Sequence, residues 1–207
     1  HSGSTLQCYD QIRLVHIRRR IVETNMTNSR IVSKEAELPI WLQEDMRSNH
    51  AGETGAVYIY RGILSVSKNE EIRSFAREHL KTEEEHLDLI SKQLSQNHRS
   101  LFLPIWKVAG FLTGAIPSIF GRNAVYATID AVETFVGEHY LDQIHRLQSK
   151  AVFPELRILL EKCRDDELEH RDEARDAKST HSSSVLGAWC WLVREGSRLA
   201  VALARWR

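Results

Sequence analysis

Two glutamate–histidine pairs carry the chemistry that this sequence suggests. Glu83 precedes His86 by three residues, and Glu167 precedes His170 by the same interval. Because residues three apart on an α-helix share a face, each pair can present a carboxylate and an imidazole to one bound ion. A single Glu-x-x-His match arises by chance in many charged helices, but two pairs on separate predicted helices indicate a shared metal centre.

Two further glutamates lie on apolar helix faces. Glu53 shares a face with Val57, Tyr60 and Leu64, and Glu133 has a similar place in a later predicted helix. A carboxylate inside an apolar stripe is costly unless something compensates it. Taken alone, each glutamate could be a buried hydrogen-bonded side chain or a sign that the helix is wrongly phased.

Together the six residues form an internal repeat, in which a helix with one glutamate is followed by a helix with a Glu-x-x-His pair. They are Glu53, Glu83, His86, Glu133, Glu167 and His170. Four carboxylates and two imidazoles suit two divalent first-row metal ions, because bridging carboxylates offset the cationic charge and each ion takes one histidine. Without metal, burying the ionised carboxylates would cost roughly several kcal/mol each.

Four long amphipathic helices must position these residues. The apolar periodicity predicts helices over about 41–67, 70–96, 122–148 and 154–177, with Asn69 as the N-cap of the second. We expect the other charged residues of these helices on solvated faces, and His79 to be a structural histidine rather than a partner of the metal ligands. The residues expected on solvated faces include Glu84, Glu85, Asp165, Asp166, Glu169 and Arg171.

The segment 101–120 is nearly continuous apolar sequence with one charge, Lys107. It is long enough for a membrane span. Two prolines and two glycines divide it, however, so we expect a short hydrophobic helix that crosses over the bundle or lies in a membrane interface.

The last predicted helix, 185–207, mixes tryptophans, aliphatic residues and arginines. This composition suits a bilayer interface. The alternative is packing on the bundle with the arginine stems lying along apolar surface.

Length and composition limit the remaining possibilities. With 207 residues we expect one domain, 41–207, preceded by an N-terminal arm, 1–40. Lys plus Arg and Asp plus Glu both number 28, so no basic surplus indicates a nucleic-acid partner. The three cysteines are widely separated and predict neither a disulfide framework nor a zinc knuckle.

From about residue 45 to its end, the sequence resembles the demethoxyubiquinone hydroxylases of coenzyme Q biosynthesis. The stretches that carry the resemblance are 49–56 (NHAGETGA), Ile59-Tyr60, the Glu83–His86 pair, 103–106 (LPIW), 110–111 (GF), 131–133 (AVE), His139-Tyr140 and 164–170 (RDDELEH). The resemblance implies an all-α fold, a ferritin-like four-helix bundle with two additional hydrophobic or amphipathic helices.

The implied activity is that of a carboxylate-bridged di-iron monooxygenase, which hydroxylates the benzoquinone ring of a polyprenylated demethoxyubiquinone precursor in ubiquinone biosynthesis. The implied cofactors are two iron ions held by the six residues above, with O₂ as co-substrate and an external reductant, for which NADH is one candidate. The resemblance also implies catalytic roles for His139 and Tyr140 near the substrate, and places Arg198, or less clearly Arg194, near the quinone or the reductant.

The implied location is peripheral to a membrane: the matrix side of the mitochondrial inner membrane in a eukaryote, or the cytoplasmic face of the plasma membrane in a bacterium. A polyprenyl quinone is too apolar to cross water, so its enzyme needs an apolar mouth, for which 101–120 and 185–207 are the candidates. Candidate partners are the quinone substrate, a lipid-binding protein, other coenzyme Q biosynthesis proteins and a second copy of the chain.

Some residues depart from the family pattern, namely Asn49, Asp130, Glu138 and a short connection between the third and fourth helices. None of them is a predicted ligand, but Asp130 and Glu138 leave the exact quinone open. Two other functions stay as alternatives: a related di-iron oxygenase or oxidase acting on another lipid-soluble substrate, and a non-catalytic iron-binding bundle. A non-catalytic iron-binding bundle would not need an apolar mouth.

Overall fold

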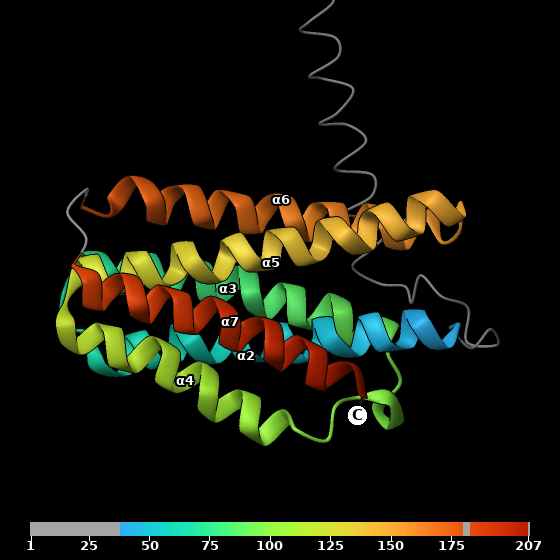
Figure 1. The fold of residues 1–207 in the computed structure, drawn as a ribbon, viewed down its shortest axis with the longest axis horizontal. Helices are drawn as coiled ribbons and strands as arrows, with labels where there is room; N and C mark the ends of the chain where they lie inside the picture. Colours follow the sequence, from blue (N-terminus) through green and yellow to red (C-terminus); the bar gives the residue numbers. More distant parts are fainter. Residues whose placement is uncertain (1–37, 180–182, 207) are drawn as a thin grey trace, which may run out of the picture. The chain divides into compact units, whose positions relative to one another are not determined.

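Four long helices form the bundle in the computed structural model, which describes residues 38–179 and 183–206. They are α2 (Ile40–Val66), α3 (Glu70–Gln93), α5 (Arg122–Lys150) and α6 (Pro154–Ala177). Short connections pair α2 with α3 and α5 with α6, and each pair is in close contact along its length (Figure 1). No strand occurs in the described ranges, so the predicted all-α bundle is confirmed. The predicted arm, 1–40, lies almost entirely outside the described residues and stays a prediction.

The helix ends follow local sequence chemistry. The Asn69 side chain accepts a hydrogen bond from the backbone nitrogen of Ile72 at 3.0 Å, which makes it the predicted N-cap of α3. Pro154 occupies the first turn of α6, where a backbone N–H is not needed. Ala151 ends α5 in a left-handed conformation with φ 51°.

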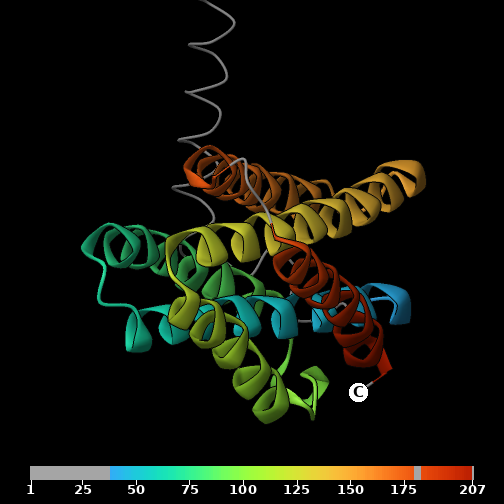
Figure 2. The same cartoon turned by 60° about the vertical axis from the view of Figure 1, so that its left-hand side comes forward.

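Two further helices, α4 (Leu103–Phe120) and α7 (Ser184–Trp206), pack outside the bundle against α2 and α5 (Figure 2). The expectation that prolines and glycines divide 101–120 is wrong, because α4 is one continuous helix. Pro104 lies in its first turn, and a Cβ on Gly110 or Gly114 would overlap backbone atoms of α2. These glycines allow the two helix backbones to approach closely, and they do not interrupt α4.

The α4 helix is long and apolar enough to cross a membrane on length and composition alone. Its glycine face, however, packs along α2, so one side of the helix belongs to the bundle.

The α7 helix is attached near both ends. Trp189 donates from Nε1 to Thr128 Oγ1 at 2.9 Å, and Arg205 donates from Nη2 to Asp45 Oδ1 at 2.8 Å. Between these contacts α7 contributes little to the core: of its described residues, only Val193 and Ala204 are buried. Packing on the bundle, which the sequence left as an alternative, therefore involves one narrow face of α7.

The described cysteines, Cys163 and Cys190, are free thiols, as expected. Cys8 lies outside the described residues.

Candidate metal centre

The structure brings the six predicted ligands together in two groups of four. One group is Glu53, Glu83, His86 and Glu167, and the other is Glu83, Glu133, Glu167 and His170; within each group the candidate ligand atoms lie within 4.8 Å of one another. Glu83 and Glu167 belong to both groups. Two adjacent ion positions with two shared carboxylates are the arrangement that the internal repeat predicts.

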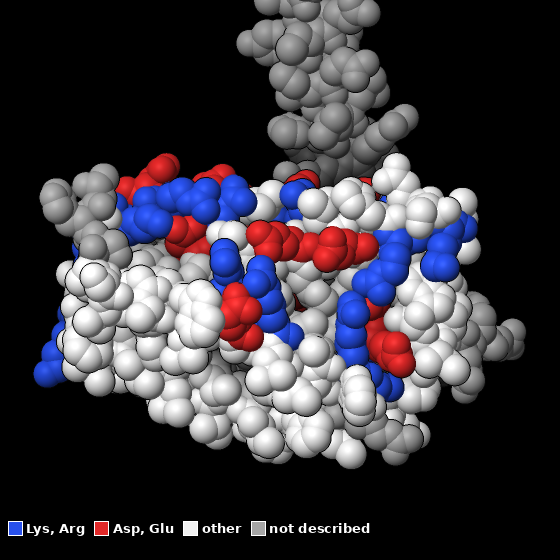
Figure 3. Space-filling view, viewed as in Figure 1, with Lys and Arg blue, Asp and Glu red and all other residues white. Residues whose placement is uncertain are grey.

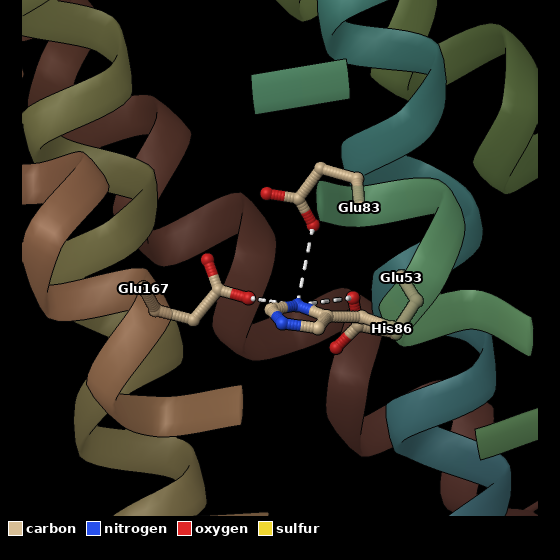
Figure 4. A group of neighbouring side chains, drawn as sticks. All are labelled: Glu53, Glu83, His86 and Glu167. Carbon is tan, nitrogen blue, oxygen red and sulfur yellow. Dashed lines mark hydrogen bonds and ion pairs between the residues drawn. The ribbon is translucent and has the colours of Figure 1, made fainter. Parts of the chain in front are cut away.

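The shared carboxylates direct one oxygen toward each histidine. Nδ1 of His86 lies 3.0 Å from Glu167 Oε1 and 4.0 Å from Glu83 Oε2. Nδ1 of His170 lies 3.2 Å from Glu83 Oε1 and 3.6 Å from Glu167 Oε2. Figure 4 shows Glu53, Glu83 and Glu167 arranged around the ring of His86. Each of the two shared glutamates can therefore bridge two ions.

The burial of these residues tests whether a metal ion fits. All four glutamates are buried, and each has at least one buried oxygen without a hydrogen-bond partner. Burial raises the pKa of Glu53, Glu83 and Glu133, and the negative charge of Glu167 raises it further. Such a set of unsatisfied acids is costly in a protein interior, and divalent cations would compensate it.

The fourth glutamate and the histidines titrate in the opposite sense. Burial alone would raise the pKa of Glu167, but the neighbouring rings of His170 and His86 lower it. Burial alone would lower the pKa of His170, but Glu167 and Glu83 raise it to about 10. The two imidazoles and the neighbouring carboxylates therefore favour one another's charged forms.

Asp166 is a contact that the sequence did not predict. It was expected on a solvated face, but Oδ2 of Asp166 lies 3.0 Å from His86 Nε2, and its side chain is only 13% exposed. The carboxylate also pairs with Lys162 at 2.8 Å. In the sequence, the only indication of this contact was that Asp166 directly precedes Glu167. Helix periodicity placed Asp166 on a different face of α6 from the predicted ligands. Glu84 and Glu85 are exposed, as predicted.

His79 contacts both a glutamate and a predicted ligand, although the sequence favoured a structural role alone. Its Nε2 lies 2.9 Å from Glu173 Oε2, as in a structural histidine. Its ring also packs against His170, with centroids 4.0 Å apart, so it touches a predicted ligand. Burial lowers the pKa of His79 to about 3, which keeps this ring neutral beside His170.

An apolar cavity of about 340 Å³ adjoins the cluster. Glu53, Glu133, Glu167 and Tyr140 line its inner end, and α4 and α7 supply its apolar walls. Ala109 of α4 and Leu192 of α7 line the cavity and are themselves exposed. The cavity therefore reaches the surface between the two outer helices.

The predicted His-Tyr pair lies beside this cavity. The Tyr140 hydroxyl donates a short hydrogen bond to Glu53 Oε1. His139 also lines the cavity, and its Nε2 lies 3.0 Å from Asn49 Oδ1 and 2.8 Å from Gln143 Nε2. Burial lowers the pKa of His139 to about 3. Their assignment as catalytic residues stays a prediction.

Arg198 does not line the cavity beside the metal cluster. It pairs with Glu195 at 2.8 Å and with Glu138 at 3.7 Å. It borders a second depression, which shares Phe135, His139 and Val201 with the cavity. Arg194 borders a different depression, near Arg175. A direct contact between Arg198 and a molecule in the cavity would require the arginine to leave its acidic partners.

The residues that depart from the family pattern lie outside the ligand groups. Asp130 binds Arg175 at 2.8 Å and also Lys178, which ties α5 to the end of α6. Burial alone would raise the pKa of Asp130, but hydrogen bonds from Lys178 and Arg175 lower it.

Comparison with known proteins agrees with this geometry. The model of the family "Ubiquinone biosynthesis protein COQ7" matches residues 41–204. The chain is 35% identical over 152 residues to an NADPH-dependent 3-demethoxyubiquinone 3-hydroxylase, mitochondrial, of Dictyostelium discoideum, covering 71% of this chain and 70% of the relative. It is 30% identical over 169 residues to a protein of the same name from Caenorhabditis elegans, covering 79% of this chain and 89% of the relative.

A bacterial relative shows a similar level of identity. The 3-demethoxyubiquinol 3-hydroxylase of Rhodospirillum rubrum is 33% identical over 161 residues, which are 75% of this chain and 74% of the relative. The family match reaches into each of the six α-helices of the described residues and includes every predicted ligand, so the chain belongs to the COQ7 family of ubiquinone biosynthesis proteins.

Proposed function

We propose that this chain hydroxylates the benzoquinone ring of a polyprenylated demethoxyubiquinone precursor at a carboxylate-bridged di-iron centre. One observation carries the proposal. The two four-residue groups, which share Glu83 and Glu167, adjoin an apolar cavity that is large enough for a quinone ring. The names of the relatives supply the reaction, and the cavity supplies a path for a lipid-soluble substrate.

In this proposal the six side chains divide into bridging and terminal ligands. Glu83 and Glu167 would hold both ions, Glu53 and His86 would complete one position, and Glu133 and His170 would complete the other. Bound iron would supply the activation of O₂ for ring hydroxylation, which also needs two electrons and two protons from an external reductant and leaves one oxygen atom as water.

The chain's own residues hold the ring and exclude water. The apolar faces of α4 and α7 that wall the cavity would keep bulk water from the carboxylates at its inner end. Tyr140, which donates to Glu53, and His139, held by Asn49 and Gln143, are our proposed substrate contacts. Arg198 would act from the rim, outside the cavity.

We also propose that α4 and α7 dock this enzyme on a membrane. Both helices carry large apolar side chains in contact with solvent, including Ile105 at 56% and Val108 at 60% exposure on α4, and Trp191 at 62% and Leu199 at 62% on α7. On the face drawn in Figure 3, charged side chains lie over α5, α6 and α7, whereas the surface over α4 is almost uniformly uncharged. An exposed apolar surface of this kind suits a lipid interface.

The names of the relatives support our proposals for the location and the reductant. The eukaryotic relatives are named mitochondrial and NADPH-dependent. We therefore place a eukaryotic form of this enzyme on the matrix side of the inner membrane, and we treat NADPH and NADH as rival reductants. A lipid-binding partner, other biosynthetic proteins and a homo-oligomer stay predictions.

The test is a single-turnover reaction. The protein is loaded anaerobically with Fe(II), mixed with a short-chain demethoxyquinone and either NADPH or NADH, and exposed to ¹⁸O₂. We expect a hydroxylated product that carries one ¹⁸O atom. Two bound irons without product from several quinone analogues would contradict the hydroxylase and favour a different lipid-soluble substrate.

A matched pair of variants tests the ligand assignment. Glu167→Ala should abolish both iron loading and turnover, because both ion positions lose a shared carboxylate. Glu169→Ala changes the exposed glutamate two residues later and should leave both unchanged. Two irons per chain in Glu167→Ala would show that the ligands are wrongly assigned.

A further inference from the structure

Two tyrosines form a reciprocal pair across the metal centre. Tyr60 follows Glu53 by seven residues on α2, and Tyr140 follows Glu133 by seven on α5. Each hydroxyl reaches the glutamate of the other helix: Tyr60 donates to Glu133 Oε1 at 3.1 Å, and Tyr140 donates to Glu53 Oε1. The internal repeat of the ligands therefore extends to these two hydrogen bonds.

The hydrogen bonds divide the carboxylate oxygens into two kinds. In Glu53 and Glu133, Oε1 accepts from a tyrosine, and Oε2 is buried without a hydrogen-bond partner. In Glu83, which belongs to both ligand groups, both oxygens are buried without a hydrogen-bond partner. Glu53 and Glu133 thus each have one oxygen without a hydrogen-bond partner, while Glu83 has two.

We propose that Tyr60 is a positioning residue that holds Glu133 as a one-oxygen ligand, and that it is the counterpart of Tyr140 at Glu53. This inference rests on the metal centre of the proposed function. Its basis is the hydrogen bond itself: a phenol bound to one carboxylate oxygen restrains the rotation of the carboxylate and favours coordination of an ion through the other oxygen. Partners of this kind, outside the ligand set, orient metal ligands in proteins generally.

The two tyrosines differ in what else they touch. Tyr140 lines the apolar cavity, where a quinone can reach its hydroxyl. Tyr60 does not line it, and its ring packs instead against Phe75, His79 and His170, with centroid distances of 6.4, 5.8 and 6.5 Å. Tyr60 therefore acts through predicted ligands, by its hydrogen bond to Glu133 and its ring contact with His170, whereas Tyr140 can act on both Glu53 and the substrate.

Cobalt binding tests this proposal without turnover. Co(II) is titrated into metal-free wild type, Tyr60→Phe, Tyr140→Phe and Tyr126→Phe while the visible d–d absorption and the binding isotherm are recorded. Tyr126→Phe is the matched control, because this buried tyrosine lies in the same core cluster but its hydroxyl reaches surface Glu71 at 3.5 Å. Phenylalanine keeps the ring in place at each position, and the melting temperature of each metal-free variant checks the fold.

We expect wild type and Tyr126→Phe to bind two Co(II) with the same spectrum. In Tyr60→Phe one of the two ions should bind roughly 10- to 100-fold more weakly, with an altered d–d band. With iron and quinone, Tyr60→Phe should lower kcat and leave KM unchanged, whereas Tyr140→Phe should change both.

Two results would overturn the inference, and they are distinguishable. If wild type binds two Co(II) and Tyr60→Phe has the same affinity and spectrum, the positioning role of Tyr60 is wrong and the metal centre stands. If wild type does not bind two ions, the proposed metal centre fails and the role of Tyr60 fails with it.

Discussion

Asp166 lies against the ring nitrogen of His86 that faces away from the other ligands. Its Oδ2 is 3.0 Å from Nε2, while Nδ1 of the same ring faces Glu167 at 3.0 Å. A carboxylate on one ring nitrogen fixes the orientation of the imidazole and increases the basicity of the other nitrogen. Asp166 and Tyr60 both contact predicted ligands from outside the set of six.

Replacing Asp166 should therefore weaken metal binding without removing a ligand. We expect Asp166→Ala to bind one of two Co(II) roughly 10- to 100-fold more weakly in an equilibrium titration. The control is Asp165→Ala, which removes an exposed carboxylate one residue earlier and should match wild type. Equal affinities for the two variants would mean that Asp166 only contributes surface charge.

The difference in stability between the metal-loaded and metal-free protein should grow as pH rises. Burial raises the pKa of Glu53, Glu83 and Glu133 above the usual 4.5 of a glutamate. A group whose pKa is raised by folding contributes stability below its unfolded pKa and loses that contribution as pH rises through the folded value. The metal-free protein should thus lose stability above about pH 4.5.

The acidic neighbours of His170 raise its pKa to about 10. This histidine therefore also makes the metal-free protein less stable as pH rises. The lowered pKa of Glu167 affects stability only below pH 4.5.

Metal binding, in contrast, strengthens as its ligands lose protons. At a free metal concentration of 100 times Kd, binding adds about 2.7 kcal/mol to the free energy of unfolding. Melting temperatures at pH 5.5 and pH 8, with and without Co(II), measure the difference. A constant or shrinking difference, or an equal one in Glu167→Ala, would contradict the expectation.

The contact between α2 and α4 should not tolerate a methyl group. A Cβ on Gly114 would overlap the backbone carbonyl of Ile59, so Gly114→Ala should lower the free energy of unfolding by about 1–3 kcal/mol or more. Gly52 has no atom within 4 Å of such a Cβ, and Gly52→Ala should be stabilising by roughly 0.5–1 kcal/mol. Urea denaturation of both variants measures the two effects, and a neutral Gly114→Ala would mean that α4 can move away from α2.

Charges placed on the exposed face of α4 should release the protein from lipid. We expect the double variant Ile105→Glu, Val108→Glu to float with anionic vesicles much less than wild type, because both side chains are more than half exposed. The control, Gln148→Glu with Ser149→Glu, adds the same charge at exposed positions near the end of α5. Equal flotation of all three proteins would reject α4 as a membrane contact.

Much of the fold could be predicted because helix faces depend on local periodicity. The inner face expected for α6, which includes Leu156, Cys163, Glu167 and His170, is buried in the structure. The predicted end of α4, residue 120, was correct. Its continuity was not, because whether a glycine interrupts a helix or packs against a neighbour depends on that neighbour.

The sequence by itself determined which helices exist, which side of each one is buried, and that six potential ligands lie on those sides. Those properties repeat every three or four residues along one chain segment. Only the tertiary structure decided that Glu83 and Glu167 are shared, that Tyr60 reaches Glu133, and that Asp166 reaches His86. Each of these contacts joins residues on different helices, and its length depends on packing distances that no single helix encodes.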